Sequence, residues 1–518
     1  MFGPFKNESL IDFSDSANKN EMEAALLRVA AEAEQQKIIP LIIGGRKVKT
    51  KETFTTVNPA KPKQVLGTFY KAGKKEAQQA INAAEKAFAD WAAEPAQRRA
   101  EILIRAAELM RLHRYEINAT MVLEVGKNWV EADADTAEAI DFFEFYAREA
   151  VRYDKGQPVG HYPNERNETF YIPLGVISVI PPWNFPNAIL AGMTTAALVA
   201  GNTVCLKPAS DAPLIGYKVA QLLFAAGIPR GVLNFVPGPG PTCGEELVTN
   251  PKVRMICFTG SRAVGLGISE KAAKMAPGQK WIKRLIAEMG GKNTLIVDET
   301  ADLDHAAVSA VASAFGFQGQ KCSACSRVIV VQQVYEKFKK KVVKLIGGIT
   351  VGPVTDERNF MGPVINPASL KKWQQYVRIA KRQARIVIGG NKINIDGGYF
   401  CEPTLVDNVK PGSRIDQEEI FAPLLAMIKV KDFEEALRVA NATEYGLTGG
   451  LCSTSRERIE RVRRELHVGN LYVNRKITGA LVNLQPFGGF NMSGTDSKAG
   501  GSDYLLLFLQ AKSFTERF

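Results

Sequence analysis

The chain has 518 residues, of which 46% are hydrophobic and 23% charged, and its formal net charge is +12. This composition is typical of a folded soluble protein, and the length predicts about two to four domains or one large α/β assembly. No run reaches the roughly 18 apolar residues that a membrane span needs. Residues 1–20 are too acidic for a secretory or transit signal. We therefore expect a cytoplasmic protein that does not insert into a membrane.

The cysteines and the basic residues argue against two further classes of protein. Seven cysteines are scattered in no disulfide spacing, which fits a reducing compartment. Only Cys322 and Cys325 form a C-x-x-C, and the chain has four histidines, so no metal site is expected. The basic residues lie along helical stretches that also carry Glu, which does not favour nucleic-acid binding. A positive field would instead help to attract an anionic substrate or cofactor.

The first 152 residues predict one helix, a group of short strands and then several long helices. Residues 21–36 are rich in Ala and Glu and predict a helix. Residues 38–69 mix β-branched residues with glycines and prolines, which predicts short strands and hairpins. Residues 74–152 carry apolar residues such as Ala84, Phe88 and Trp91 at helical spacing, so we expect them in a helical core.

Two alternations of strands and helices follow along the chain. In the first, apolar runs at 175–180, 203–206, 232–236 and 255–258 are separated by helical patterns at 188–200, 213–226 and 263–275. In the second, strands are expected at 294–297 and 327–331, and helices at 303–317 and 335–345. Short buried strands alternating with helices indicate parallel, doubly wound sheets, which bind ligands outside the carboxyl ends of their strands. Near the C-terminus, the apolar run Tyr504–Gln510 predicts an edge strand that would need a partner.

A candidate nucleophile follows the helix expected at 303–317, in the segment Gly319-Gln320-Lys321-Cys322-Ser323. A cysteine after a glycine turn is suited to attack on an aldehyde, since a few per cent of a free thiol with a pKa of about 8.5 is ionised at neutral pH. The neighbouring Lys321 is expected to favour the thiolate. The alternative is that Cys322 is a small buried residue, as most free cysteines are.

Two further motifs add a candidate base and a candidate oxyanion donor. Glu288 precedes Gly290-Gly291 at the start of a strand, where a carboxylate can act as a general base toward water. Asn184 lies between two prolines at the end of another strand, and its amide is a good oxyanion donor. The alternatives are a solvated loop acid for Glu288 and a helix cap for Asn184.

A fourth motif, Phe258-Thr259-Gly260-Ser261, predicts a strand, a glycine turn and a helix capped by Ser261. Such a helix start presents free N–H groups to a phosphate, although an ordinary capped helix would have the same sequence. The G-x-G-x-x-G fingerprint of dinucleotide binding does not occur between a strand and a helix.

Taken in order, these four motifs resemble the aldehyde dehydrogenase superfamily, and the resemblance covers nearly the whole chain. Further matching segments are Leu206-Lys207-Pro208, Glu418-Glu419-Ile420-Phe421, Tyr445-Gly446-Leu447-Thr448 and Gln485-Pro486-Phe487-Gly488-Gly489. The resemblance implies an α/β fold with a doubly wound cofactor domain, a second α/β catalytic domain and a small β flap for oligomerisation. We expect the cofactor domain, with its N-terminal helices, in residues 1–150 and 172–289. The catalytic domain would span 290–485, and the oligomerisation segments 151–171 and 486–518.

The resemblance also implies roles for individual residues. Cys322 would attack the aldehyde, Asn184 and the Cys322 N–H would hold the oxyanion, and Glu288 would activate the water that hydrolyses the thioester. The expected cofactor-binding residues are Pro182, Trp183, Lys207, Ser210, Gly260, Ser261, Glu419 and Phe421. Many members carry Glu where this chain has Ser210, and a serine neither anchors the ribose diol as strongly nor repels a 2′-phosphate. We therefore expect NAD as the cofactor, with NADP tolerated.

Several segments resemble one branch of that superfamily, the 1-pyrroline-5-carboxylate dehydrogenases, which oxidise L-glutamate γ-semialdehyde to L-glutamate in proline and arginine degradation. These segments are Gln320 to Arg327, Asn474-Arg475, Thr478-Gly479-Ala480 and Ser493-Gly494-Thr495. The resemblance implies that the N–H groups of Gly479 and Ala480, beside the Ser323 hydroxyl, hold the substrate carboxylate. A small Gly-Ala turn can direct its N–H groups toward an anion. Phe185 and Phe487 would then pack on the aliphatic part of the substrate.

Other hypotheses are open at this point. The chain could be an aldehyde dehydrogenase with another substrate, such as succinate semialdehyde or an aliphatic aldehyde. It could also be a non-catalytic protein on the same fold. A disulfide between Cys322 and Cys325 would inactivate the nucleophile reversibly. We expect a homo-oligomer acting on a small aldehyde, with a proline dehydrogenase as a partner that supplies the substrate.

Overall fold

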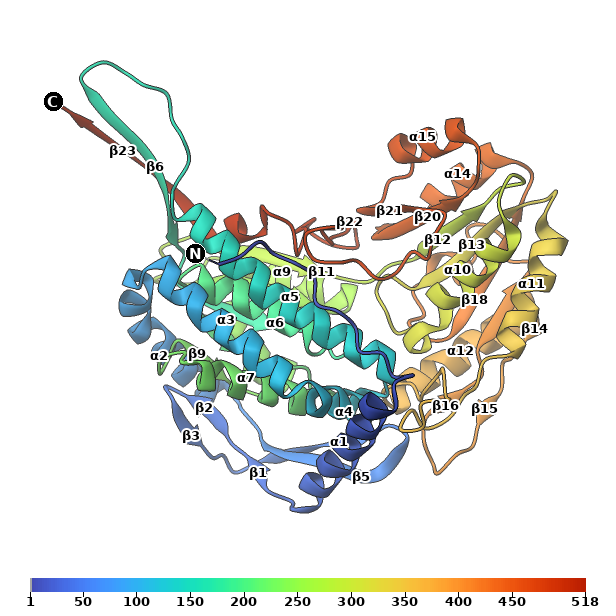
Figure 1. The fold of residues 1–518 in the computed structure, drawn as a ribbon, viewed down its shortest axis with the longest axis horizontal. Helices are drawn as coiled ribbons and strands as arrows, with labels where there is room; N and C mark the ends of the chain where they lie inside the picture. Colours follow the sequence, from blue (N-terminus) through green and yellow to red (C-terminus); the bar gives the residue numbers. More distant parts are fainter. Residues whose placement is uncertain (1) are drawn as a thin grey trace.

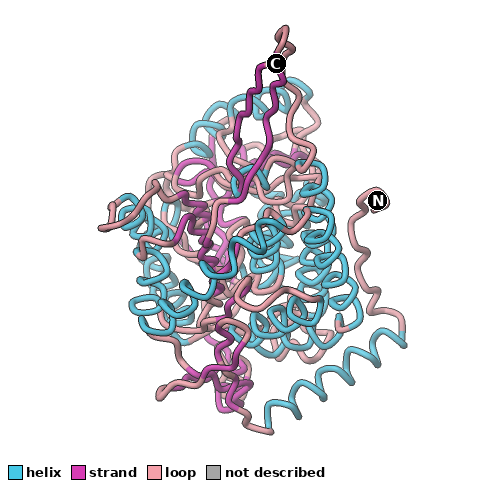
Figure 2. Tube along the Cα trace, turned by 90° about the vertical axis from the view of Figure 1, so that its left-hand side faces the viewer, coloured by secondary structure: helices cyan, strands magenta, loops and turns pink. Residues whose placement is uncertain are grey.

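The computed structural model describes residues 2–518 and contains two seven-stranded sheets, one in each half of the body (Figure 1). In a view turned by 90°, the strands form a central layer with helices on both sides (Figure 2). A two-stranded arm projects from the body and carries the C-terminus (Figure 1). The expected α/β fold with two sheets and a small β flap is confirmed.

The first 153 residues form a small sheet and a layer of helices. Helix α1 begins where the Asp15 carboxylate accepts the N–H groups of Ala17 and Asn18. Strands β1, β5 and β4 form a three-stranded sheet, whereas β2 and β3 join the first large sheet. The elements are α1 (Ser16–Glu34), β1 (Ile38–Ile39), β2 (Leu41–Ile43), β3 (Arg46–Val48), β4 (Thr53–Asn58), β5 (Lys61–Tyr70), α2 (Lys74–Ala93), α3 (Ala96–Leu112), α4 (Arg114–Val125) and α5 (Trp129–Tyr153).

The first large sheet has the order β11-β10-β7-β8-β9-β2-β3. Its strands from β11 to β9 are parallel, and β2 pairs antiparallel to β9, so the expected parallel sheet gains an antiparallel edge. The fully buried runs of β7 and β8 fit a sheet covered by helices on both faces. The elements are β7 (Val176–Ile180), α6 (Ala188–Val199), β8 (Thr203–Leu206), α7 (Pro213–Ala226), β9 (Leu233–Phe235), α8 (Glu245–Thr249), β10 (Val253–Thr259), α9 (Arg262–Ala273) and β11 (Arg284–Glu288).

The order of this first sheet creates a switch point between β7 and β10. Strands β8 and β9 extend from one side of β7, while β10 and β11 extend from the other. Ligands of doubly wound sheets bind beside the carboxyl ends of the strands at such a point. Asn184, Lys207 and Ser261 follow β7, β8 and β10, and Glu288 ends β11, so the topology gathers four of the predicted site residues at one edge.

The second large sheet has the order β14-β17-β18-β13-β12-β20-β21, and its strands are parallel except for β14. The strands at 294–297 and 327–331 and the helices that follow them are confirmed, with small differences at their ends. The main elements are β12 (Asn293–Val297), α10 (Leu303–Phe315), β13 (Cys325–Val331), α11 (Tyr335–Gly347), α12 (Pro367–Gln383), β14 (Arg385–Ile388), β17 (Thr404–Asp407), α13 (Arg414–Gln417), β18 (Leu424–Val430), α14 (Phe433–Asn441), β20 (Thr448–Cys452), α15 (Arg456–Glu465) and β21 (Asn470–Val473). Short pairs are β15 (Lys392–Ile393) with β16 (Phe400–Cys401) and β19 (Tyr445–Gly446) with β22 (Phe490–Asn491).

The arm consists of β6 (Glu165–Pro173) and β23 (Leu509–Arg517), paired antiparallel along their whole length. The expected strand over Tyr504–Gln510 was misplaced, because Tyr504–Phe508 forms a 3₁₀ helix and the strand begins at Leu509. Tyr504 and Phe508 are buried against the body, so the apolar run anchors the arm. The exposed part of β23 is mostly polar and was not recognisable as a strand from hydrophobicity.

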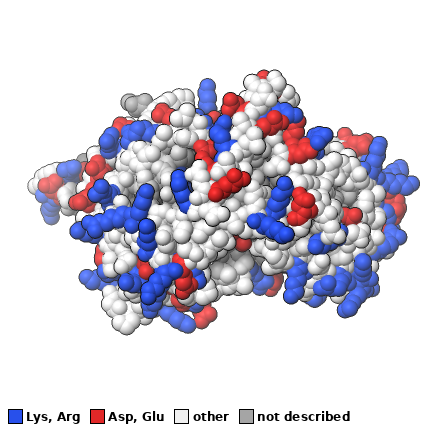
Figure 3. All heavy atoms as spheres, turned by 90° about the horizontal axis from the view of Figure 1, so that it is seen from below, with Lys and Arg blue, Asp and Glu red and all other residues white. Residues whose placement is uncertain are grey.

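On the face shown in Figure 3, Lys and Arg side chains are scattered over both halves and mixed with Asp and Glu. The expectation that the charge of +12 does not serve nucleic-acid binding stays a prediction. Among the helices of residues 2–518, none is both long and apolar enough to cross a bilayer.

Candidate active site

A cavity of about 110 Å³ contains Cys322 and Glu288 in its lining. Glu288 comes from the carboxyl end of β11 in the first sheet, whereas Cys322 lies three residues before β13 in the second. The five predicted substrate residues line the same cavity: Phe185, Ser323, Gly479, Ala480 and Phe487. The structure therefore brings together, from both halves of the chain, residues that the sequence analysis assigned to one site.

The turn before Cys322 has an unusual backbone. Phe317 and Gln318 have φ angles of 48° and 57°, and both side chains are buried. Left-handed conformations at non-glycine residues cost energy and persist only where the surroundings enforce them. The side chain of Asn293 braces the residues that follow this turn, since its amide donates to the carbonyls of Cys322 (2.7 Å) and Ala324 (2.9 Å). Asn293 begins β12 shortly after Gly290-Gly291, and its bracing role was not anticipated from the sequence.

The electrostatics of Cys322 differ from expectation. Burial and the nearby carboxylates of Glu419 and Glu288 raise the pKa of the thiol to about 12. Lys321 does not offset this, because its ammonium pairs with Glu131 at 2.6 Å. The prediction that Lys321 favours the thiolate is therefore wrong: a residue adjacent in sequence is engaged by an acid on a distant helix.

Asn184 is almost fully buried and its side chain faces the Cys322 turn. Its amide donates to the carbonyl of Gln320 at 3.0 Å. Helix α6 starts four residues later with Asn187 at its N-cap position, so the alternative that Asn184 caps the helix is wrong. Because an amide carries two N–H groups, the second remains available for an oxyanion formed at Cys322.

Glu288 is held by residues on either side of β22. Its carboxylate accepts the Ser497 hydroxyl at 2.8 Å, the Ser497 N–H at 3.3 Å and the Gly489 N–H at 3.1 Å. Burial outweighs these bonds and raises the pKa of Glu288 to about 7. Such a pKa suits a group that exchanges protons with water at neutral pH.

One cavity residue that sequence reasoning missed is Glu138, on the inner side of α5. Burial, with the nearby Asp135, raises the pKa of Glu138 to about 8. Asp135 itself pairs with the buried Lys127 at 2.8 Å, and that ammonium lies 4.0 Å from the ring centre of Phe185. In the sequence, Glu138 has the helical spacing of a structural residue, and only the packing of α5 on the cavity reveals it.

A second cavity, of about 510 Å³, lies at the carboxyl ends of the first sheet and includes Lys207, Gly240, Gly244, Val264 and Ile268 in its lining. Lys207 is buried, and its ammonium donates to the carbonyls of Pro208 (3.1 Å) and Gly238 (3.2 Å). Ser261 occupies the N-cap position of α9, as expected, but its hydroxyl makes no capping hydrogen bond. The helix start thereby keeps unbonded N–H groups for a phosphate.

The other residues predicted to bind the cofactor lie near the ends of several strands. Pro182 and Trp183 follow β7, and the ring of Trp183 meets Phe421 edge-on with centroids 5.6 Å apart. The carboxylate of Glu419 accepts the Gly291 N–H at 2.9 Å. Gly260 donates its N–H to the Glu288 carbonyl at 3.0 Å, and Ser210 is exposed. The donors, apolar surfaces and free helix start fit a dinucleotide that runs from the Lys207 cavity toward Cys322.

Comparisons with known proteins agree with this site. The model of the "Aldehyde dehydrogenase family" matches residues 47–514. A 1-pyrroline-5-carboxylate dehydrogenase from Geobacillus sp. is 53% identical, with both chains covered completely. The structure of 1-pyrroline-5-carboxylate dehydrogenase from Thermus with bound NAD superposes with a TM-score of 0.98 at 52% identity, again over 100% of both chains. Proline utilization A from Bdellovibrio bacteriovorus has a TM-score of 0.97 at 43% identity, covering 99% of this chain and 53% of its own.

The chain belongs to the aldehyde dehydrogenase family. Within that family, the full-length relatives described above carry the name 1-pyrroline-5-carboxylate dehydrogenase. The resemblance inferred from the motifs is thus confirmed for the family and for the branch.

Proposed function

We propose that this protein oxidises L-glutamate γ-semialdehyde to L-glutamate and reduces NAD. The observation that carries the proposal is the cavity that joins a cysteine and a base to an anchor for an amino acid. Cys322 and Glu288 share its lining with Ser323, Gly479, Ala480 and Glu138. The name and NAD-bound state of the Thermus relative support the same activity.

The reaction begins at Cys322. Its thiol gives up its proton to water, and the sulfur adds to the aldehyde carbon to form a thiohemiacetal. The second N–H of Asn184 and the N–H of Cys322 are the donors for the resulting oxyanion. The Cys322 N–H has no acceptor within residues 2–518, so it is free to donate. Donors fixed in advance in a buried site stabilise developing charge without a reorganisation cost.

NAD would be held by Lys207, the start of α9, Glu419 and the Trp183–Phe421 pair. When bound, it supplies the acceptor for the hydride that leaves the tetrahedral carbon. Loss of the hydride leaves a thioester on Cys322, and Glu288 then takes a proton from the water that attacks it. The products are the carboxylate and the free thiol, ready for a further turnover.

Substrate recognition follows from the charges of an amino-acid aldehyde. The N–H groups of Gly479 and Ala480 and the Ser323 hydroxyl would bind the α-carboxylate. The Glu138 carboxylate would bind the α-ammonium, and this positive charge would favour the ionised form of Glu138. Phe185 and Phe487 would pack on the methylene groups. The open-chain aldehyde is the reactive species, because the cyclic imine formed by loss of water offers no free carbonyl to the thiol.

The experiment that tests the proposal follows reduction of NAD and of NADP by absorbance with three aldehydes. These are L-glutamate γ-semialdehyde, succinate semialdehyde and propionaldehyde, each with the wild type and with Cys322→Ala. We expect the highest kcat/KM for the glutamate semialdehyde with NAD, and no activity in the variant. Equal or better activity with succinate semialdehyde or propionaldehyde would contradict the substrate assignment and leave the family unchanged.

Three further proposals concern the setting of the enzyme. We propose a homo-oligomer, in which a second subunit covers the arm, and a location in the cytoplasm, where the seven free cysteines remain reduced. The likeness to one half of proline utilization A supports a proline dehydrogenase as the supplier of substrate. A coupled assay with that enzyme should reduce NAD without a lag; a lag equal to that of freely released substrate would exclude direct transfer.

A further inference from the structure

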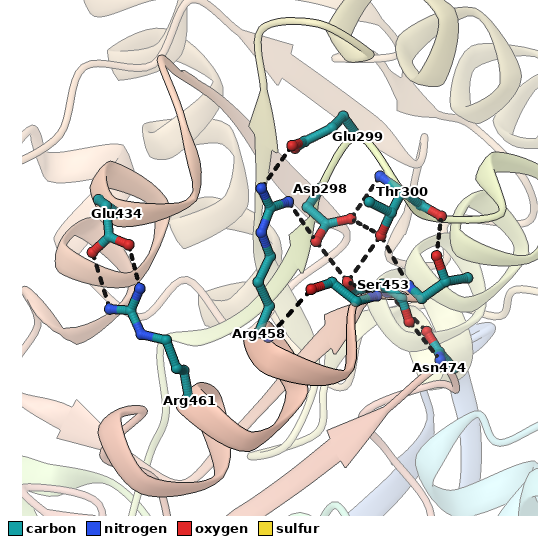
Figure 4. Close-up of polar contacts among 10 residues, drawn as sticks. Asp298, Glu299, Thr300, Glu434, Ser453, Arg458, Arg461 and Asn474 are labelled. Atoms are coloured by element: carbon teal, nitrogen blue, oxygen red, sulfur yellow. Dashed lines mark hydrogen bonds and ion pairs between the residues drawn. The ribbon is translucent and has the colours of Figure 1, made fainter.

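The loop that carries Gly479 and Ala480 leaves the second sheet at Asn474, directly after β21. Asn474 has a φ of 51°, and its side chain forms a reciprocal pair with the backbone of Ser453. The Ser453 N–H donates to Oδ1 and Nδ2 donates to the Ser453 carbonyl, both at 2.9 Å (Figure 4). The Ser453 hydroxyl in turn donates to the buried Asp298 at 2.6 Å. The base of the loop is therefore fixed to the sheet.

The next residue, Arg475, turns its side chain back over its own loop. Its Nη2 donates to the carbonyls of Gly479 (3.2 Å) and Thr478 (3.4 Å), and its Nε donates to the carbonyl of Lys476 (3.3 Å). The guanidinium also lies 4.9 Å from the ring centre of Tyr472. A planar group with several donors can hold adjacent carbonyls together in a way that a lysine ammonium cannot.

The position of these carbonyls determines where the N–H groups point. In a trans peptide unit the C=O and the following N–H have opposite directions, and no described peptide bond is cis. Holding the carbonyls of Thr478 and Gly479 toward Arg475 directs the N–H groups of Gly479 and Ala480 away from it. Gly479 has a φ of 79°, and a left-handed residue within such a turn forms an anion-binding concavity.

Both N–H groups remain unused by the protein. Neither the Gly479 nor the Ala480 N–H has an acceptor among residues 2–518. Both residues line the cavity that contains Cys322. The loop therefore has its carbonyls bound to an arginine outside the cavity and its free donors on residues that face the aldehyde site.

We propose that Arg475 is a positioning residue for the substrate carboxylate: it orients the Gly479 and Ala480 N–H groups without touching the substrate. This inference rests on the proposed function, because it requires that those N–H groups bind a carboxylate. The cation also polarises the two peptide units, which strengthens their N–H groups as donors. A role limited to stability would affect all substrates equally, whereas this role affects only those with a carboxylate at the loop.

The test compares Arg475→Met and Arg475→Lys with Arg461→Met. Arg461 pairs with Glu434 and Glu465 on the outside of the same domain and does not contact the loop (Figure 4). We would measure kcat and KM for L-glutamate γ-semialdehyde and propionaldehyde, and inhibition by L-glutamate. For Arg475→Met we expect KM for the glutamate semialdehyde and the inhibition constant of L-glutamate to rise about tenfold or more, as for loss of hydrogen bonds to a charged group. The kcat/KM for propionaldehyde should change less than about twofold.

The outcomes separate this inference from the proposed function. Arg475→Lys should fall between wild type and Arg475→Met, and Arg461→Met should match wild type. A wild type without preference for the glutamate semialdehyde would overturn both proposals. If the wild type has that preference but KM for the glutamate semialdehyde is unchanged in Arg475→Met, only the role of Arg475 is overturned. Equal losses with both aldehydes would also overturn it. If Arg475→Met does not fold, Arg475→Lys replaces it in the test. A larger rise in KM for L-glutamate γ-semialdehyde than for propionaldehyde would support the role of Arg475, and equal rises would overturn it.

Discussion

Cys322 illustrates how the environment of one residue alters its chemistry. A cysteine beside a lysine in sequence suggests a lowered thiol pKa, yet Lys321 is paired with Glu131 and the thiol is near two carboxylates. The resting enzyme therefore holds a neutral thiol, and activation has to come from the change in environment when ligands bind. A neutral resting thiol also resists oxidation, because the thiolate is the reactive form.

The first prediction concerns this resting thiol. With a pKa raised to about 12, the rate of alkylation of Cys322 by iodoacetamide should be low at neutral pH. It should rise about tenfold for each pH unit from 7 to 9, in proportion to the thiolate. The measurement is loss of activity over time at each pH, with modification located by mass spectrometry and Cys322→Ala as the control. A rate that levels off near pH 8.5 would show an ordinary thiol.

The second prediction concerns Glu288, whose pKa is raised to about 7 by burial. Only the ionised carboxylate can take a proton from water, so thioester hydrolysis should rise as pH increases through about 7 and fall below it. In Glu288→Gln we expect the steady-state rate to drop about 10² to 10⁴-fold. A burst of reduced NAD, close to one per active site, should remain, and the acyl group should be detectable on Cys322. If the burst were absent, Glu288 would be needed for a step that precedes thioester hydrolysis, and its assignment as the base for water would be wrong.

At the scale of elements, helix α7 depends on another helix for its N-terminal cap. Its own N-cap residue, Ala212, offers no side-chain acceptor. The buried Glu124 of α4 replaces it, accepting the N–H groups of Leu214 at 2.8 Å and Ile215 at 3.0 Å. Burial raises the pKa of Glu124 to about 7. Because the folded-state pKa lies above the unfolded value, the associated stability is present at low pH and is lost as pH rises through about 7.

The third prediction follows from this cap. Glu124→Ala leaves two buried N–H groups without an acceptor and should lower the free energy of unfolding by about 2 kcal/mol or more. Glu124→Gln keeps an acceptor and should lose less, while its midpoint of thermal unfolding should depend less on pH between about 4.5 and 7. Calorimetry or circular dichroism at several pH values would measure both effects. A wild-type-like midpoint in Glu124→Ala would contradict the capping role.

At the scale of the whole molecule, the arm formed by β6 and β23 is exposed to solvent in the isolated chain. An isolated pair of strands is at best marginally stable in water, yet β6 and β23 extend from the body (Figure 1). Large side chains are exposed here: Phe514 of β23 at 39%, and Tyr162 in the loop before β6 at 62%. A second subunit that buries these side chains would account for the length of the arm.

The fourth prediction tests that assembly. The wild type should have a mass in sedimentation or light scattering that is a multiple of 56.7 kDa. Phe514→Asp should shift the mass toward the monomer, since it places a charge in the apolar part of the arm. Ser513→Asp adds the same charge on the opposite face of β23 and serves as the matched control. A monomeric wild type, or an unchanged mass in Phe514→Asp, would contradict the proposed role of the arm.

The sequence by itself determined the order of the main elements as far as residue 345 and named the candidate residues of the reaction. Strand β8 and helix α7 were predicted at their observed bounds, because apolar periodicity reflects local backbone geometry. The motifs around Asn184, Glu288 and Cys322 were recognisable because each combines a reactive side chain with the backbone turn that presents it. Their roles stay predictions, but their presence around one cavity follows the topology expected from the sequence.

Only the tertiary structure decided which charges meet. Lys321 pairs with Glu131, 190 positions away, and Glu138 reaches the cavity because α5 packs there. The apolar run at Tyr504 became an anchor rather than a strand, since the body offered it a buried site. Periodicity shows which residues of one element share a face, whereas electrostatic partners are chosen by contacts between elements. The pKa values of Cys322 and Glu288, and the orientation of the Gly479–Ala480 loop, therefore depend on the folded arrangement.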